Sequence, residues 1–277
     1  MNVRVITLNV WNTEGDPRRL DLINRELRTL APDLLALQEV VQTAEVDSVG
    51  RLLRGLDLQA THQAGLQSKP PPFADRYGGS MVATRWPHRL AEIVDQRLSD
   101  APDMPWATLA VSLAVPGEGD MLFIGTTAAW RLGSEAARER QAVAVAELDA
   151  RQRGVLPTVI AGDFNAGPQA ASIRFLSGLQ SLGGRSVCYH DAWAIAGEGP
   201  GHTWSVDNPN AAAGIDAIVR QAGVRNRFDY VFVGGWDAHP KAHARVMRAQ
   251  LVFDKPIDGI WPSDHFGLLV DLDVGKD

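Results

Sequence analysis

The feature of this sequence that most limits its possible folds is a set of polar residues at the ends of predicted β-strands. Runs of apolar, often β-branched, residues predict these strands over residues 3–10, 34–37, 158–161 and 266–272. In chain order the polar residues that border them are Asn9, Glu39, Asp163, Asn165, Asp264 and His265. Because strand ends gather at the edge of a sheet, we expect these side chains to converge on one rim. Such a rim would suit a hard cation and a phosphate group.

Other segments complete the expected secondary structure. Further strands are predicted over residues 80–84, 107–115, 121–127, 228–233 and 244–253. Asp16-Pro17 predicts a helix start with Asp16 as N-cap, and Ala31-Pro32 predicts its end. Helices are also predicted around residues 46–56, 134–151 and 169–178. Residues 69–73, which include three consecutive prolines, and residues 181–227 are expected to be rich in loops.

Size and composition favour one globular domain over residues 1–277, with 45% apolar and 22% charged residues. The first residues lack a signal-peptide pattern, and no apolar run reaches the roughly 18 residues of a membrane helix. We therefore expect a cytoplasmic monomer with no membrane partner.

The single cysteine, Cys188, leaves no intrachain disulfide. The net charge of −6 weakly disfavours a long nucleic acid, because proteins that hold phosphates usually present a basic face.

Each polar residue on its own also has an ordinary structural explanation. Asn9 could cap a turn, and Glu39 could be a surface charge. Asp163 and Asn165 could form an Asx turn, and Asp264 could lie in a plain turn between strands. What argues against these readings is the combination, because all of these residues border strands.

Five segments in the same order resemble the motif set of the endonuclease/exonuclease/phosphatase superfamily, also called the DNase I-like fold. They are TLNVW at residues 7–11, LQE at 37–39, GDFN at 162–165, FDYVF at 228–232 and SDH at 263–265. Residues 79–85, GSMVATR, resemble the central strand of that family. The likeness extends from residue 3 to residue 272. It implies an α/β fold, a four-layer α/β sandwich in which two packed mixed β-sheets are flanked by helices.

The resemblance also implies a divalent-metal-dependent phosphoesterase that hydrolyses a phosphodiester or phosphomonoester with an activated water. Glu39 would be the main metal ligand, and Asn9 and Asp264 would complete the metal and phosphate site. An all-oxygen site favours Mg²⁺, with Mn²⁺ as the substitute. The expected catalytic residues are Asp163, Asn165, Asp229 and His265. Asp163 would position or deprotonate water, Asn165 would donate to a phosphoryl oxygen, and Asp229 would orient a protonated His265.

One segment departs from the family pattern. Many members have a Thr-His-Leu motif after the strand that follows the central one, and its histidine helps to polarise the phosphate or the leaving group. Here residues 126–130 read TTAAW, without histidine. We hypothesise that Trp130 or Arg131 forms part of that wall instead. The following helix carries Arg138, Arg140 and Gln141, and the family often has an arginine and a glutamine there, although both are also routine on a solvated helix face.

Substrate contacts are expected from loops over the rim, at residues 69–76, 97–106 and 202–210. The candidate substrate-binding residues are Arg76, Trp130, Arg131, His202 and Trp204. Tryptophans near the motifs could stack on a base or sugar, or could fill the core. The expected partner is a small phosphoester or a short nucleic-acid end.

Two readings from other classes stay open. A non-catalytic binding protein could keep this fold, and the missing histidine is the feature in its favour. A zinc hydrolase could use scattered histidines, namely His62, His88, His190 and His202, although their spacing is not that of zinc ligands. A nuclease acting on short nucleic-acid ends is the alternative within the superfamily.

Overall fold

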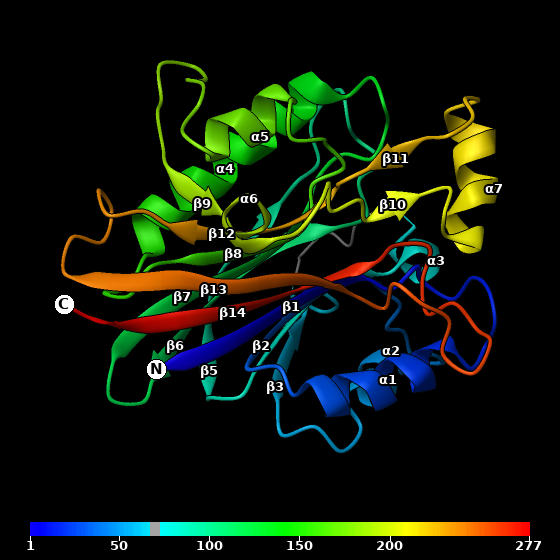
Figure 1. Cartoon of the computed structure of the whole chain (residues 1–277), viewed down its shortest axis with the longest axis horizontal. Helices are drawn as coiled ribbons and strands as arrows, with labels where there is room; N and C mark the ends of the chain where they lie inside the picture. Colours follow the sequence, from blue (N-terminus) through cyan, green and yellow to red (C-terminus); the bar gives the residue numbers. More distant parts are fainter. Residues whose placement is uncertain (67–72) are drawn as a thin grey trace.

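Two six-stranded sheets stack face to face in the described part of the chain (Figure 1). The computed structural model describes residues 1–66 and 73–277. The first sheet has the order β13-β14-β1-β2-β4-β3, formed by Ala242–Val252, Gly267–Lys276, Asn2–Asn9, Leu34–Val40, Gly79–Thr84 and Gln59–His62. The second has the order β5-β6-β7-β8-β12-β9, formed by His88–Asp95, Ala107–Val115, Gly119–Thr127, Val159–Asp163, Asp229–Gly234 and Tyr189–Asp191. A separate ribbon pairs β10 (Trp204–Ser205) with β11 (Arg225–Asn226).

Helices cover the outer face of each sheet, as Figure 1 shows. Helices α1 (Arg19–Leu30) and α2 (Ser48–Leu53) pack on the first sheet, and α4 (Glu135–Gln152) and α5 (Ala171–Leu176) pack on the second. The shorter helices are α3 (Ala74–Tyr77), α6 (Ala192–Ala196) and α7 (Pro209–Ile218). One apolar core fills the space between the sheets, and another lies under each helical layer. The predicted four-layer α/β sandwich is thus confirmed.

The strand directions bring the predicted polar residues to one edge. β1 runs parallel to β2, and β7 runs parallel to β8, so the carboxyl ends within each pair lie together. β14 is antiparallel to β1, and β12 is antiparallel to β8. The starts of β12 and β14 therefore lie beside the ends of β8 and β1. The two stacked sheets place both groups of strand ends at the same rim.

The start of the first helix differs from the sequence prediction. Asp16 does not cap it; the helix begins at Arg19, after a turn. The Asp16 carboxylate accepts the backbone N–H of Arg18 at 2.9 Å and also pairs with the Arg18 side chain. Because this local bond already engages the Asp16 carboxylate three residues before Arg19, the chain makes a turn at residues 17 and 18 before the helix begins. The predicted end is confirmed, with Ala31 in the left-handed conformation as C-cap.

Edge elements were the main omission from the sequence prediction. β3 and β5 each lie at one edge of a sheet, and most of their residues are partly exposed. Such strands lack the continuous apolar run that marks a buried strand. The predicted loop region 181–227 contains β9, α6, β10, α7 and β11, which are all short. The predicted proline-rich loop lies outside the described residues except for Phe73.

No helix among the described residues has both the length and the apolar character to span a bilayer.

Gly162 allows β7 and β8 to approach closely just before Asp163. A Cβ at this position would lie 1.9 Å from the backbone oxygen of Thr126. We therefore expect Gly162→Ala to lower the free energy of unfolding by about 2–3 kcal/mol, because the two strands must separate. Denaturant unfolding measures this change. Gly167→Ala is the matched control, since a Cβ there meets nothing within 4 Å. Equal stability of the two variants would contradict this account of the close approach.

Candidate active site

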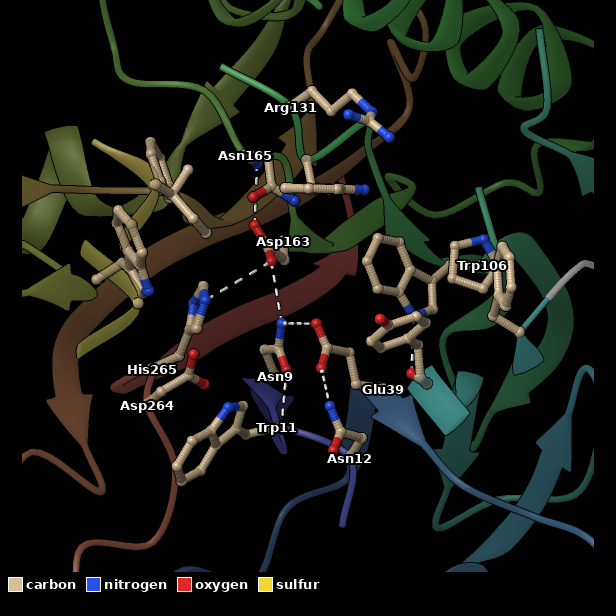
Figure 2. A pocket seen from close by; sticks show the side chains of 18 of the residues that line it. Asn9, Trp11, Asn12, Glu39, Trp106, Arg131, Asp163, Asn165, Asp264 and His265 are labelled. Carbon is tan, nitrogen blue, oxygen red and sulfur yellow. Dashed lines mark hydrogen bonds and ion pairs between the residues drawn. The ribbon is translucent and has the colours of Figure 1, made fainter. Parts of the chain in front are cut away.

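Side chains from both sheets point into one cavity at the rim (Figure 2). Asn9 ends β1, and Glu39 lies in β2 of the same sheet. Asp163 ends β8 of the second sheet. Asp264 and His265 lie just before β14. The structure therefore brings these predicted residues together, although they come from distant parts of the chain.

The amide of Asn9 connects the two sheets. Its Nδ2 donates to Glu39 Oε1 at 3.0 Å and to Asp163 Oδ2 at 3.1 Å. Its Oδ1 accepts the backbone N–H of Trp11 at 2.9 Å, which fixes which end of the amide faces the carboxylates. Asn9 is 2% exposed. It therefore holds one acidic group from each sheet at a set separation.

Glu39 is presented by an irregular stretch of β2. The register between β2 and β4 shifts between Leu37 and Val40, and Glu39 has a φ of 61°. A bulge of this kind redirects a side chain, and a left-handed non-glycine residue is strained. Both carboxylate oxygens have amide donors, because Asn12 Nδ2 donates to Oε2 at 3.1 Å. Asn12 was absent from the sequence prediction, since nothing in its spacing marks it.

His265 forms a chain of contacts with two aspartates. Its Nδ1 lies 2.9 Å from Asp229 Oδ2, and its Nε2 lies 3.9 Å from Asp163 Oδ2. The backbone N–H of Asp229 donates to Thr203 Oγ1, which fixes the start of β12. The second oxygen of Asp229, Oδ1, is buried without a hydrogen-bond partner. One oxygen or nitrogen from each of Asp163, Asp229 and His265 lies within 4.8 Å of the others.

Burial and mutual repulsion raise the pKa values of the acids. Burial, with the charge of Asp264, raises the pKa of Glu39 to about 7. Burial, reinforced by Asp229, raises the pKa of Asp163 to about 7, although His265 opposes this shift. Burial also raises the pKa of Asp264. Burial disfavours the charged imidazole of His265, but three neighbouring aspartates outweigh it and raise its pKa well above the ordinary value. His265 is therefore protonated at neutral pH.

Arg19 secures the loops beneath these acids, and the sequence did not single it out. Its guanidinium is 2% exposed and donates to the backbone oxygens of Val10, Trp11, Glu14 and Pro262. It also lies 5.0 Å from the centroid of the Trp11 ring. Burial lowers its pKa to about 10, so it stays charged. Beside Arg18 in a helical stretch it resembles a surface residue, and only the fold shows that it joins two loops.

The chain matches a known family over most of its length. The model of the Endonuclease/Exonuclease/phosphatase family matches residues 6–265. The chain belongs to this family. Members of this family are hydrolytic phosphoesterases that use divalent metal ions. A comparison with curated protein sequences gives no match.

Solved structures share the fold at low identity. TDP2 from D. rerio, complexed with a single strand DNA product, has a TM-score of 0.72 and 18% identity over 98% of this chain and 99% of that chain. The human Nocturnin catalytic domain, with a bound sulfate anion, has a TM-score of 0.68 and 21% identity over 99% and 94%. An endonuclease/exonuclease/phosphatase from Bacteroides vulgatus has a TM-score of 0.69 and 16% identity over 99% of both chains. At these identities the likeness shows the fold alone.

The donor set of this family member fits a hard divalent cation. Glu39 and Asp264 are half-buried carboxyl groups, and the negative charge of Asp264 raises the pKa of Glu39, so a cation beside them would relieve the repulsion. The Asp163, Asp229 and His265 group is a poorer metal site. Both ring nitrogens of its imidazole already face carboxylates, at 2.9 Å from Asp229 and 3.9 Å from Asp163, so neither is turned toward an open cation position.

Four of the five predicted substrate-binding residues line the cavity, which has a volume of about 550 Å³. They are Arg76, Trp130, Arg131 and Trp204. His202 is not among the described lining residues, and its role stays a prediction. Trp204 is 8% exposed and stacks on Phe228, so it fills a small core as well as facing the cavity. Trp106 also lines the cavity, at the end of the predicted substrate loop 97–106, and Tyr77 lines it just beyond the predicted loop 69–76.

Arg138 and Gln141 support the wall from behind. Arg138 Nη1 donates to the backbone oxygens of Ala129 and Arg131 at 2.9 and 2.8 Å. Gln141 Oε1 accepts the N–H of Ala129 at 2.9 Å. Both side chains are buried, at 5% and 3% exposed. They hold the loop after β7 and do not line the cavity.

The zinc alternative gains no support from the geometry. Among the described residues, His62, His88, His190 and His202 belong to no group of three potential ligands. His62 and His88 instead bond to Val40 O and to threonine hydroxyls.

Asn12 should affect metal affinity through Glu39. Asn12→Leu removes one of the two amides that orient the carboxylate, so we expect the dissociation constant for Mg²⁺ to rise about 10-fold. Isothermal titration calorimetry measures it. The matched control is Asn2→Leu, an exposed asparagine at the opposite end of β1. Unchanged affinity in Asn12→Leu would refute the orienting role.

The raised pKa of Glu39 predicts a pH-dependent stability difference between wild type and Glu39→Gln. The folded wild type keeps a proton that the unfolded chain loses between pH 4.5 and about 7, so it loses stability as the pH rises through this window. Without metal, the variant should match wild type near pH 5 and melt about 3 °C higher near pH 8. Mg²⁺ should reverse the order.

The comparison with a variant is necessary because other groups titrate in this range. Burial lowers the pKa values of His62, His88 and His239, which makes the folded protein gain stability as the pH rises. These histidines are present in both wild type and Glu39→Gln, so their contribution cancels in the difference in stability between the two proteins. If the difference in melting temperature between wild type and Glu39→Gln does not change with pH, the pKa of Glu39 in the folded protein is not raised.

Proposed function

We propose that this protein hydrolyses a phosphodiester or phosphomonoester with the help of Mg²⁺, for which Mn²⁺ can substitute. One observation carries the proposal. The Asn9 amide holds Glu39 on one side and Asp163 on the other, and Asp163 in turn faces the His265–Asp229 pair. A cation-binding acid, a proton acceptor and a proton donor therefore surround one small space.

Asp163 is the residue that activates water in this proposal. A pKa raised to about 7 makes its carboxylate a stronger base than an ordinary aspartate, and near neutral pH a substantial share is still ionised. The backbone N–H of Asn165 donates to Asp163 Oδ1 at 2.9 Å and holds the carboxylate in place. The attacking water would give its proton to Asp163.

Asn165 and His265 stabilise the negative charge that develops on the phosphoryl oxygens. The Asn165 Nδ2 donates one hydrogen to Ala128 O at 3.2 Å, and its second hydrogen would serve a phosphoryl oxygen. Asp229 holds Nδ1 of His265, so the protonated Nε2 faces the cavity beside Asp163. A positive charge fixed in a buried site stabilises a transition state strongly.

Glu39 and Asp264 would hold the divalent cation, whereas Asn9, which we predicted as a third ligand, would orient the Glu39 carboxylate through its Nδ2. When bound, the cation neutralises charge on the phosphoryl oxygens and supports the leaving oxygen. We further propose that residues 1–277 form one domain that acts as a monomer.

A nuclease acting on short nucleic-acid ends is the second candidate. The structure of D. rerio TDP2 contains a single strand DNA product, and that protein shares this fold. The net charge of −6 argues against extended contact with a nucleic-acid backbone. A non-catalytic binding protein is the remaining alternative.

A substrate panel tests the proposal. Wild type should hydrolyse bis(p-nitrophenyl) phosphate, p-nitrophenyl phosphate, plasmid DNA or a short oligonucleotide with Mg²⁺ or Mn²⁺, and EDTA should stop the reaction.

His265→Ala should lower kcat by about 10²–10³-fold, because the fixed positive charge is lost. His190→Ala is the matched control, since His190 does not line the cavity. Full activity in His265→Ala would refute the assigned role. Intact Mg²⁺ binding without turnover on any substrate would favour the binding protein.

A further inference from the structure

The cavity has one wall that the proposed chemistry does not use. This aromatic wall consists of Tyr77, Trp106, Trp130 and Arg131. Three separate segments supply it, namely α3, the loop that ends just before β6 and the loop after β7. In Figure 2, Trp106 lies on the Glu39 side of the site, away from His265. A substrate group attached to the bound phosphate would lie against this wall.

The aromatic wall is held in place by polar contacts behind it. Trp106 Nε1 donates to the backbone oxygen of Tyr77 at 3.2 Å, and the Trp106 side chain packs in a small core with Ala129 and Ala137. Trp130 packs against the same core. Arg138 fixes the backbone on both sides of Trp130 through the oxygens of Ala129 and Arg131. A wall prepared in this way loses little conformational entropy when it binds a ligand.

The chemistry of the wall favours a planar aromatic ring. The Arg131 guanidinium lies 4.9 Å from the centroid of the Trp130 ring, and Asp103 holds that guanidinium at 2.7 Å. Indole and guanidinium groups both bind flat, polarizable rings better than they bind alkyl chains. The ring of Tyr77 extends the same aromatic surface, and Trp106, which is 6% exposed, supports it from the small core with only an edge toward the cavity.

The charges of the cavity disfavour a nucleic-acid strand. Apart from His265, the cationic side chains among the described lining residues are Arg76 and Arg131, and Arg131 is already paired with Asp103. Proteins that hold a strand neutralise several phosphates at once. A cavity of about 550 Å³ suits a ligand of drug or mononucleotide size.

We propose that the aromatic wall is a subsite for a single aromatic ring attached to the phosphate, so that the substrate is a small aromatic phosphoester. The ring is a nucleobase or a simple aryl group, since both offer the same flat surface. This inference rests on the proposed function, because it places the phosphate at the Glu39 and His265 site. It assigns Trp130 and Trp106 to specificity.

Binding of phosphate monoesters tests the subsite without requiring turnover. The probes are methyl phosphate, phenyl phosphate and thymidine 5′-monophosphate, titrated calorimetrically into the full chain with saturating MgCl₂. Wild type should bind at least one ring-bearing probe about 10-fold or more tightly than methyl phosphate. Trp130→Ala should remove most of this ratio, and Trp130→Phe should restore part of it. The matched control, Trp236→Ala, should keep it, because Trp236 is 70% exposed and does not line the cavity.

The possible outcomes test the aromatic subsite separately from the proposed hydrolysis of phosphoesters. Tighter binding of phenyl phosphate identifies an aryl group, and tighter binding of the nucleotide identifies a base. Equal affinity for all three monoesters overturns the subsite even if the protein hydrolyses phosphoesters. Tighter, steeply salt-dependent binding of an oligonucleotide of about twelve nucleotides overturns it in favour of a strand. A ring preference without hydrolysis on any substrate would keep the subsite and refute the proposed catalysis.

Discussion

The accumulation of negative charge at the rim is the constraint on which the rest of the site depends. Glu39, Asp163, Asp229 and Asp264 lie together where the two sheets end, and the Asn9 amide and the His265 imidazole link the first three of them. Charges of the same sign separate unless the surrounding structure prevents it. Here the core between the sheets fixes the strand ends, and the free energy of apolar burial holds the acids close.

The polar residues outside the reacting groups have a common task. Arg19 joins the loop after β1 to the loop before β14, and Arg138 braces the loop after β7. Ser263 Oγ donates to the backbone oxygen of Asn9 at 2.6 Å, and Thr203 Oγ1 accepts the N–H of Asp229. Each of them bonds to backbone atoms of a different segment. Loops that carry functional side chains are thereby made as rigid as the strands that they connect.

Sequence reasoning recovered the parts of the protein that follow from local pattern. Asn9, Glu39, Asp163 and His265 could be found because each borders a strand within a recognisable motif, and the central strands could be found because they are continuously apolar. Asn12 and Arg19 could not, because their roles depend on contacts with distant segments. Arg19, for example, reaches Pro262, which lies 243 positions later in the chain. Edge strands such as β3 were not predicted from the sequence for a related reason, because only their pairing with a neighbouring strand defines them.

The left-handed backbone at Trp11, Asn12, Glu39 and Asn165 has a consequence for how descendants of this chain can diverge. At such positions glycine is the residue that the backbone prefers, and the present side chains persist against that preference. In a lineage that no longer needs hydrolysis, substitution to glycine at these positions would therefore be tolerated, and it would relieve backbone strain and stabilise the fold. Glycine at the position of Glu39 in a homologous sequence would mark a protein that kept the scaffold after its chemistry was abandoned.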